Sequence, residues 1–179
     1  PKIAIIGAGS VVFTRRLVGD LLSFPSLTGC HIALMDVESK RLDLIARLVR
    51  KMARDAGVPA TFESTQDRRQ ALAGADYVIT TIRVGDDDAV DCGIPYKYGI
   101  DQAVGDTIGP GGVMKALRTV PVLLDICRDM EELCPEAWLL NYTNPMAISC
   151  WAIGQATRVR YVGLCHSVQG TTEQLAKYI

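Results

Sequence analysis

The chain has 179 residues, of which 49% are hydrophobic and 22% are charged, and its formal net charge is −1. This balance is typical of a single globular domain. No basic patch points to nucleic acid, and the longest apolar runs are strand-sized, so neither nucleic acid nor a membrane is an expected partner. The start of the chain resembles a strand and not a secretory signal, so we expect a cytoplasmic protein whose six cysteines are reduced.

Short apolar runs alternate along the chain with amphipathic segments. The runs predict strands at residues 2–6, 31–36, 60–64, 77–82, 137–142 and 160–164. The amphipathic segments predict helices at residues 10–24, 38–56, 67–72, 112–132, 145–156 and 169–179. Such alternation is typical of right-handed βαβ units. We therefore expect a Rossmann-type α/β domain with a doubly wound parallel sheet in the order 3-2-1-4-5-6.

Residues 83–112 interrupt this alternation, because they are rich in Gly and Asp and contain Pro95 and Pro110. We expect this segment to be irregular. Long irregular segments inside compact domains are usually either functional or mobile. Since ligands of doubly wound sheets bind beyond the carboxyl ends of the strands, the residues at those ends are the first candidates for a site.

The first predicted strand is followed by the turn Gly7-Ala8-Gly9-Ser10, which opens the first predicted helix. Gly7 permits a tight turn, Gly9 lets the backbone approach a pyrophosphate, and the helix N-terminus beginning near Ser10 offers N–H donors. Val12 stands where such turns usually have a third glycine. By itself the turn is therefore equally compatible with an ordinary strand-to-helix connection.

Asp36 ends the second predicted strand, near the position of the acid that binds ribose in dinucleotide-binding domains. Its carboxylate would accept hydrogen bonds from both ribose hydroxyls and would repel a 2′-phosphate, so the sequence predicts NAD and not NADP. The alternative role of Asp36 is to cap the next helix. The end of the fourth strand should pass beside the nicotinamide ribose, which makes Arg83 a further candidate for binding the cofactor.

Two polar clusters follow the fifth and sixth predicted strands and should lie beside the nicotinamide. Asn144 follows the fifth strand, and its amide could donate to a sugar or carboxylate oxygen, although Asn-Pro is also an ordinary turn step. Cys165 and His166 follow the sixth strand. Neighbouring side chains in extended backbone point to opposite sides, so one could bind a metal while the other faces a substrate. The alternatives are a core thiol and a loop histidine.

Four motifs span the chain: GAGS at residues 7–10, GDTIGPGG at 105–112, NYTNPM at 141–146 and GLCHSVQGT at 163–171. Together and in this order they resemble glycoside hydrolase family 4, and within it the melibiase-type α-galactosidases. Four concurrent motifs are far more specific than the glycine turn alone. This family is the NAD-dependent exception to glycoside hydrolysis by two carboxylates.

The resemblance implies a glycosidase that cleaves α-galactosides, or related α-glycosides, by oxidation and elimination. NAD would accept a hydride from C3 of the sugar, and a base would remove the acidified proton from C2. A divalent metal, typically Mn²⁺, would stabilise the enediolate as a Lewis acid. After the glycosidic oxygen leaves and water adds, NADH would return the hydride.

The resemblance also implies residue roles. Cys165 matches the metal-binding cysteine, and Asn144 matches the asparagine that contacts the substrate near C2 and C3. His166 lies where some members place an acid for the leaving group, a role that histidine can fill at neutral pH. Asp106 is the candidate for a sugar hydroxyl, with capping of the next turn as its alternative. Arg83 begins a stretch that helps to bind phosphate in relatives acting on phosphorylated sugars, so phosphorylation of the sugar stays open.

The family's second metal ligand, a histidine, and its C2 base, usually a tyrosine, correspond to positions beyond Ile179. We therefore expect residues 1–179 to form the NAD-binding domain and a second domain to complete catalysis. We also expect a homo-oligomer acting on a small-molecule sugar. Two alternatives are kept: a 2-hydroxy acid dehydrogenase of the lactate or malate type, whose N-terminal domain shares the expected fold, and an inactive NAD-binding fragment.

Overall fold

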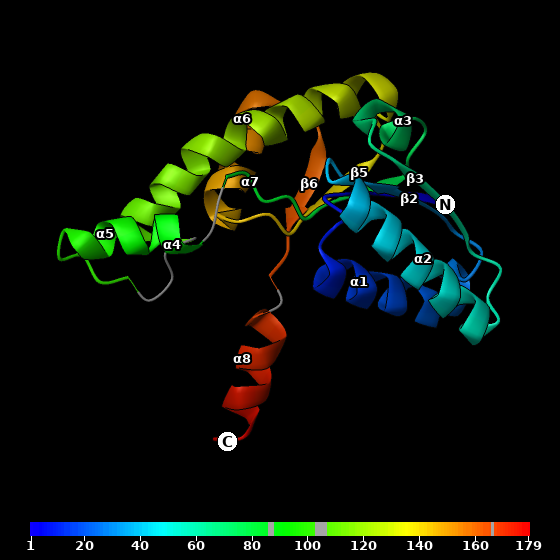
Figure 1. Ribbon diagram of the computed structural model, residues 1–179, viewed down its shortest axis with the longest axis horizontal. Helices are drawn as coiled ribbons and strands as arrows, with labels where there is room; N and C mark the ends of the chain where they lie inside the picture. Colours follow the sequence, from blue (N-terminus) through cyan, green and yellow to red (C-terminus); the bar gives the residue numbers. More distant parts are fainter. Residues whose placement is uncertain (86–87, 103–106, 166) are drawn as a thin grey trace.

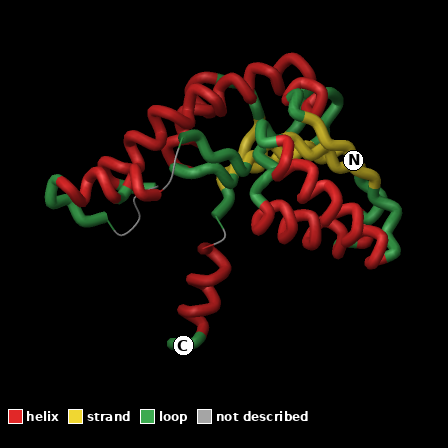
Figure 2. The backbone as a smooth tube through the Cα atoms, viewed as in Figure 1, coloured by secondary structure: helices red, strands yellow, loops and turns green. Residues whose placement is uncertain are grey.

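The structure is a computed structural model that describes residues 1–85, 88–102, 107–165 and 167–179 (Figures 1 and 2). Its strands are β1 (Lys2–Ile6), β2 (His31–Met35), β3 (Thr61–Thr65), β4 (Tyr77–Thr80), β5 (Trp138–Asn141) and β6 (Arg160–Gly163). Its helices are α1 (Val11–Ser23), η1 (Pro25–Leu27), α2 (Ser39–Ala56), α3 (Arg68–Leu72), α4 (Asp88–Asp91), α5 (Gly93–Lys97), α6 (Gly109–Leu133), α7 (Met146–Ala156) and α8 (Ser167–Ala176). Every predicted strand and helix is present, with its ends shifted by at most three residues.

The six strands form one sheet in the order β3-β2-β1-β4-β5-β6, and all neighbours are parallel. This confirms the predicted order and the Rossmann-type fold. The strand β4 is two residues shorter than predicted. Beyond the end of β4, the Ile82 amide donates to the Thr143 hydroxyl at 3.2 Å and not to a neighbouring strand. The strand therefore ends early, although the β-branched residues of this segment favour a longer strand.

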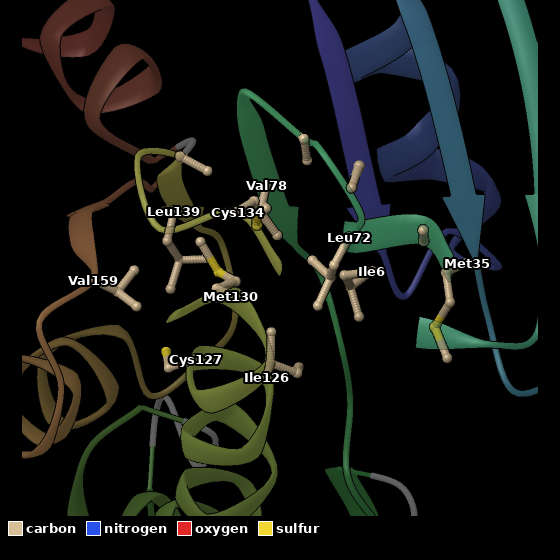
Figure 3. Packing of buried hydrophobic residues seen from close by; sticks show 14 of the residues in the cluster. Ile6, Met35, Leu72, Val78, Ile126, Cys127, Met130, Cys134, Leu139 and Val159 are labelled. Carbon is tan, nitrogen blue, oxygen red and sulfur yellow. The ribbon is translucent and has the colours of Figure 1, made fainter. Parts of the chain in front are cut away.

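Both faces of the sheet are covered, which explains why the strands are almost continuously apolar. Successive residues of β1 alternate between the two faces: Ile3 and Ile5 pack with α1 and α2, whereas Ala4 and Ile6 pack with α3 and α6. Figure 1 shows α1 and α2 below the sheet, α3 and α6 above it, and α7 beside β6 under α6. Figure 3 shows the cluster on the face of α3 and α6, in which Met130 of α6 lies close to Leu139 of β5.

The prediction that residues 83–112 are irregular is wrong in part. This segment contains α4 and α5, and α6 begins at Gly109, three residues before its predicted start. The reason is a tertiary contact: Asp91 of α4 is 2% exposed, and both its carboxylate oxygens accept hydrogen bonds from Arg118 of α6 at 2.9 Å. Figure 1 shows α4 and α5 against the end of α6, away from the sheet.

The cysteines that the structure describes, Cys30, Cys92, Cys127, Cys134, Cys150 and Cys165, are all free thiols, as predicted. In the described part of the chain, no helix is long and apolar enough to cross a membrane.

Candidate functional site

A cleft of about 480 Å³ opens where β1, β2, β4 and β5 end. Its lining residues come from the loops after these strands and from the starts of three helices: Gly7, Gly9, Ser10, Phe13, Met35, Asp36, Val37, Glu38, Arg41, Thr81, Ile82, Arg83, Lys115, Tyr142 and Asn144. All five predicted cofactor residues are among them, and so is Asn144. Because four strand ends lie side by side about 4.8 Å apart, the cleft crosses about 14 Å of the sheet edge.

The glycine turn is held tightly against the neighbouring strands. The amides of Gly7 and Ala8 both donate to the Met35 carbonyl at 2.9 Å, and the Thr81 hydroxyl donates to the Gly7 carbonyl at 3.0 Å. Gly7 has a φ of +91°, and a Cβ there would lie 2.8 Å from the backbone of Thr81. The turn therefore requires glycine at this position, as the sequence predicts.

Asp36 joins the end of β2 to the glycine turn. Its Oδ2 accepts a hydrogen bond from the Gly9 amide at 2.7 Å, and its Oδ1 accepts one from the Glu38 amide at 2.9 Å. A Cβ on Gly9 would lie 2.7 Å from Oδ2, so the carboxylate occupies the space that the missing side chain leaves. The N-cap of α2 is Glu38, so the alternative in which Asp36 is the cap residue is wrong. The Asp36 carboxylate nevertheless accepts a hydrogen bond from the Glu38 amide, where the helix begins.

The other end of the cleft lies beyond β4 and β5 and holds Arg83, Lys115 and Asn144. Lys115 is the residue that the sequence analysis missed. It is 5% exposed and lies on the buried stripe of α6, in register with Gly111 and Thr119 at spacings of four residues. A lysine at an apolar position of an amphipathic helix was the signal that could have found it.

A second cavity, of about 520 Å³, lies beside the cleft and reaches the end of β6. Phe13 and Tyr142 line both spaces, with ring centroids 6.4 Å apart. Burial raises the pKa of the Tyr142 hydroxyl, and the nearby Asp20 carboxylate raises it further. Cys165 lines this second cavity and is exposed, with its Sγ 2.6 Å from the Ser167 hydroxyl.

The predicted metal and substrate residues are therefore brought together only in part. Tyr142 connects the space beside Asn144 to the space beside Cys165, whereas His166 and Asp106 lie outside the described residues. No group of three or more His, Cys, Asp or Glu side chains in the described ranges could hold a metal ion. One thiol does not make a site for a divalent cation, so these residues alone do not fit one.

The parallel sheet, the glycine turn and the acid after β2 define a dinucleotide-binding domain. The family model described as family 4 glycosyl hydrolase matches residues 2–179. The chain therefore belongs to glycosyl hydrolase family 4.

The chain is similar to an α-galactosidase of Bacillus subtilis (strain 168), with 46% identity over 98% of this chain and 41% of the relative. It spans about two fifths of the curated relatives of this kind that it matches. A 6-phospho-β-glucosidase from Thermotoga maritima, solved with manganese, NAD⁺ and glucose-6-phosphate, is similar over 99% of this chain and 42% of that chain (TM-score 0.86, 25% identity).

A lactate dehydrogenase from Eimeria maxima is similar over 92% of this chain and 43% of that chain (TM-score 0.64, 19% identity). At this identity the likeness concerns the fold alone. Together with a similar malate dehydrogenase from Picrophilus torridus, it confirms the predicted likeness in fold to lactate and malate dehydrogenases, and it does not favour the alternative dehydrogenase function.

Proposed function

We propose that this chain is the NAD-binding part of a glycosidase that cleaves α-galactosides through oxidation at C3 of the sugar. The observation that carries the proposal is the Asp36 carboxylate, held 2.7 Å from the Gly9 amide across the glycine turn of a family 4 chain. The similar α-galactosidase supports the sugar, and the Thermotoga maritima enzyme solved with NAD⁺ supports the cofactor.

The residues of the cleft fit NAD. The glycine turn and the start of α1 would receive the pyrophosphate, because a helix N-terminus presents N–H donors and a partial positive charge. Asp36 has both oxygens on backbone amides and still lines the cleft, where it would accept from the adenine ribose hydroxyls. Arg83, beyond β4, would contact the nicotinamide half. When bound, NAD supplies the hydride acceptor for the sugar.

The chain's own residues would hold the sugar at the far end of the cleft. Asn144 would bind and orient the hydroxyls near C2 and C3, with Asp106 as a second contact. His166 would protonate the leaving oxygen. Cys165 would be one ligand of a divalent metal, with its other ligands outside the described residues. The similar enzyme solved with manganese supports a metal in this family.

Three broader properties follow from the same proposal. The sugar is proposed to be an unphosphorylated α-galactoside, and a phosphorylated glycoside contacted by Arg83 is the second candidate, because the Thermotoga maritima relative was solved with glucose-6-phosphate. A second domain would supply the C2 base and the remaining metal ligands. The whole protein would be a cytoplasmic homo-oligomer.

The proposal is tested by assaying the whole protein on 4-nitrophenyl α-galactoside with NAD⁺, Mn²⁺ and a thiol reductant. Hydrolysis should require both NAD⁺ and Mn²⁺. Hydrolysis that persists after both are removed, or none under any of these conditions, would contradict the proposal. Parallel assays on the 6-phosphorylated glycoside distinguish the two candidate sugars.

The metal assignment has its own test, the variant Cys165→Ser. Loss of the thiolate should lower the Mn²⁺-dependent rate by at least about tenfold, a loss typical even of residues that only support a metal ligand. Cys92→Ser is the control, since Cys92 lies between α4 and α5 and lines neither cavity. Full metal-dependent activity in Cys165→Ser would overturn the assignment.

A further inference from the structure

Asn141 is a fully buried polar residue that none of the proposed roles uses. It ends β5 and is 0% exposed. Its Oδ1 accepts hydrogen bonds from the Thr80 hydroxyl at 2.9 Å and from the Thr143 amide at 3.2 Å. Its Nδ2 donates to the Thr143 carbonyl at 3.1 Å and, more weakly, to Sγ of Cys150 at 3.8 Å.

These contacts allow the Asn141 side chain only one orientation. The backbone amide of Thr143 can only donate and its carbonyl can only accept, so Oδ1 and Nδ2 of Asn141 cannot exchange places. A buried polar network whose donors and acceptors are all paired is rigid. Asn141 therefore fixes the backbone of Thr143 at both its N–H and its C=O.

The same network reaches the ends of three neighbouring strands. Beyond β4, the Ile82 amide donates to the Thr143 hydroxyl at 3.2 Å. Beyond β6, the Leu164 amide donates to the Asn141 carbonyl at 2.9 Å. Because β4, β5 and β6 are adjacent in the sheet, one buried side chain and its own backbone connect the loops that follow all three.

Each backbone that this network holds directly precedes a residue of the proposed site. The pairs are Ile82 with Arg83, Thr143 with Asn144, and Leu164 with Cys165. Arg83 and Asn144 line the cleft, and Cys165 lines the cavity beside it. Consecutive Cα atoms are only about 3.8 Å apart, so a shift of the network would move all three site residues.

We propose that Asn141 is a positioning residue that fixes Arg83, Asn144 and Cys165 relative to one another. The inference rests on the proposed function and deepens it, because it assigns the alignment of the cofactor contact, the sugar contact and the metal ligand to one buried amide. The described residues that line the two spaces do not include Asn141, so it acts through the three loops.

The test compares catalysis with cofactor binding in the whole protein. Asn141→Leu keeps the side-chain volume and removes the hydrogen bonds. It should lower kcat on 4-nitrophenyl α-galactoside by about ten- to a hundredfold, the cost of misplacing reacting groups by up to about 1 Å. The Kd of NAD⁺ should stay within about threefold, because the glycine turn and Asp36 follow β1 and β2, outside this network.

Leu139→Ala is the matched control. Leu139 lies on the same face of β5 and is also 0% exposed, but its side chain holds no loop through hydrogen bonds. The cavity should lower the Tm, whereas kcat should stay within about twofold of wild type. An equal loss of kcat in both variants, at a temperature where both are folded, would overturn the inference.

Thr143→Val and Thr143→Ser form a second pair, which serves even if Asn141→Leu does not fold. The valine variant loses the acceptor of the Ile82 amide and should lower kcat by about fivefold, the size of one hydrogen bond. The serine variant keeps this acceptor and should restore kcat to within about twofold of wild type. The same kcat in both variants would contradict the positioning role.

Hydrogen exchange of this chain tests the network without any assay of activity. In Asn141→Leu, or in Thr143→Val for Ile82, the amides of Ile82 and Leu164 should exchange at least about fivefold faster than in wild type. The Ile5 amide of β1 should be unaffected. Unchanged exchange of Ile82 and Leu164 would overturn the inference. A wild-type protein without NAD⁺- and Mn²⁺-dependent hydrolysis would instead contradict the proposed function, so the two failures are distinguishable.

Discussion

Gly7 and Asp36 show how single residues create the nucleotide site. Gly7 lets the chain turn sharply under the backbone of Thr81, and Asp36 fills the space beside Gly9 with a carboxylate. Gly7 acts through the absence of a side chain and Asp36 through its charge. Neither role depends on how much apolar surface the residue buries. A substitution at Gly7 is therefore expected to act through backbone strain, and one at Asp36 through the loss of a charge in the site.

Gly7→Ala provides a test at this scale. The φ of +91° and the 2.8 Å approach to Thr81 should together destabilise the chain by about 2 kcal/mol or more. Urea unfolding measures the change. Gly29→Ala is the control, since a Cβ there meets nothing within 4 Å, and its effect should stay within about 0.5 kcal/mol. Equal stability of the two variants would contradict the strain inferred at Gly7.

The segment between β4 and α6 is positioned by side chains of neighbouring elements. Arg118 of α6 bonds Asp91 of α4 through both carboxylate oxygens, and its Nε donates to the Val84 carbonyl at 3.4 Å. Val84 directly follows Arg83, so the same arginine supports the loop that lines the cleft. A buried carboxylate that loses its partner keeps the cost of its burial.

Arg118→Met should therefore lower the free energy of unfolding by about 2 to 3 kcal/mol, below the full range for buried pairs because the Arg118 side chain is 29% exposed. Denaturant titration checks this value. Arg128→Met breaks an exposed pair with Asp125 on the same helix and should cost less than about 0.5 kcal/mol. If both variants lowered the free energy of unfolding by the same amount, the pair of Asp91 and Arg118 would not hold the segment between β4 and α6 in place.

Lys2 of β1, His31 of β2 and Glu63 of β3 form an ion-pair group that links three neighbouring strands. The Glu63 carboxylate lies 3.0 Å from the Lys2 ammonium group and 3.5 Å from Nε2 of His31. Burial raises the pKa of Glu63, but Lys2 and His31 together lower it by more, so the pKa lies below its usual range. Because the folded state lowers this pKa, Glu63 stabilises the fold above its unfolded value of about 4.3.

This stabilisation should be lost as the pH falls from about 5 through the folded pKa of Glu63. Glu63→Gln lacks the titration, so its free energy of unfolding should change less than that of wild type between pH 5 and pH 3. Urea titrations across this range make the comparison, with Glu136→Gln as the control because the Glu136 side chain is 89% exposed. If the free energy of unfolding changed equally with pH in wild type and in Glu63→Gln, ionised Glu63 would not stabilise the fold.

At the scale of the whole molecule, the cleft joins loops from four strands that are far apart in the sequence. A ligand that binds only the folded chain should stabilise it, by about 2.7 kcal/mol at one hundred times its Kd. For a chain of this size that corresponds to a rise in Tm of about 5 to 10 °C. Thermal scans with NAD⁺ should show this rise.

NADP⁺ is the matched comparison, because the Asp36 carboxylate should repel its 2′-phosphate. NADP⁺ should raise the Tm less than NAD⁺ does, and Asp36→Asn should narrow the difference between them. An equal rise with both nucleotides in the wild type would contradict the assignment of Asp36 to the ribose.

The fold could be predicted almost completely, whereas the site could be predicted only in part. The strands β1 and β2 are recognisable because their apolar runs end at a glycine turn and at an acid, which are local signals. α4 and α5 could not be predicted, since their positions depend on the contact between Asp91 and Arg118, which are far apart in sequence. The helical pattern could have marked Lys115 as buried, but its place in the cleft depends on where α6 crosses the sheet.

The sequence by itself determined the kinds and order of the elements, the sheet order and the glycine turn, because hydrophobic period and backbone freedom are properties of neighbouring residues. Tertiary structure alone decided that Asp36 bonds the Gly9 amide, that Asp91 is buried under Arg118, and that Lys115 lines the nucleotide cleft. These contacts join residues that meet only when the parallel strands are aligned and the helices are packed on them. Their free energies depend on burial, which no local pattern specifies.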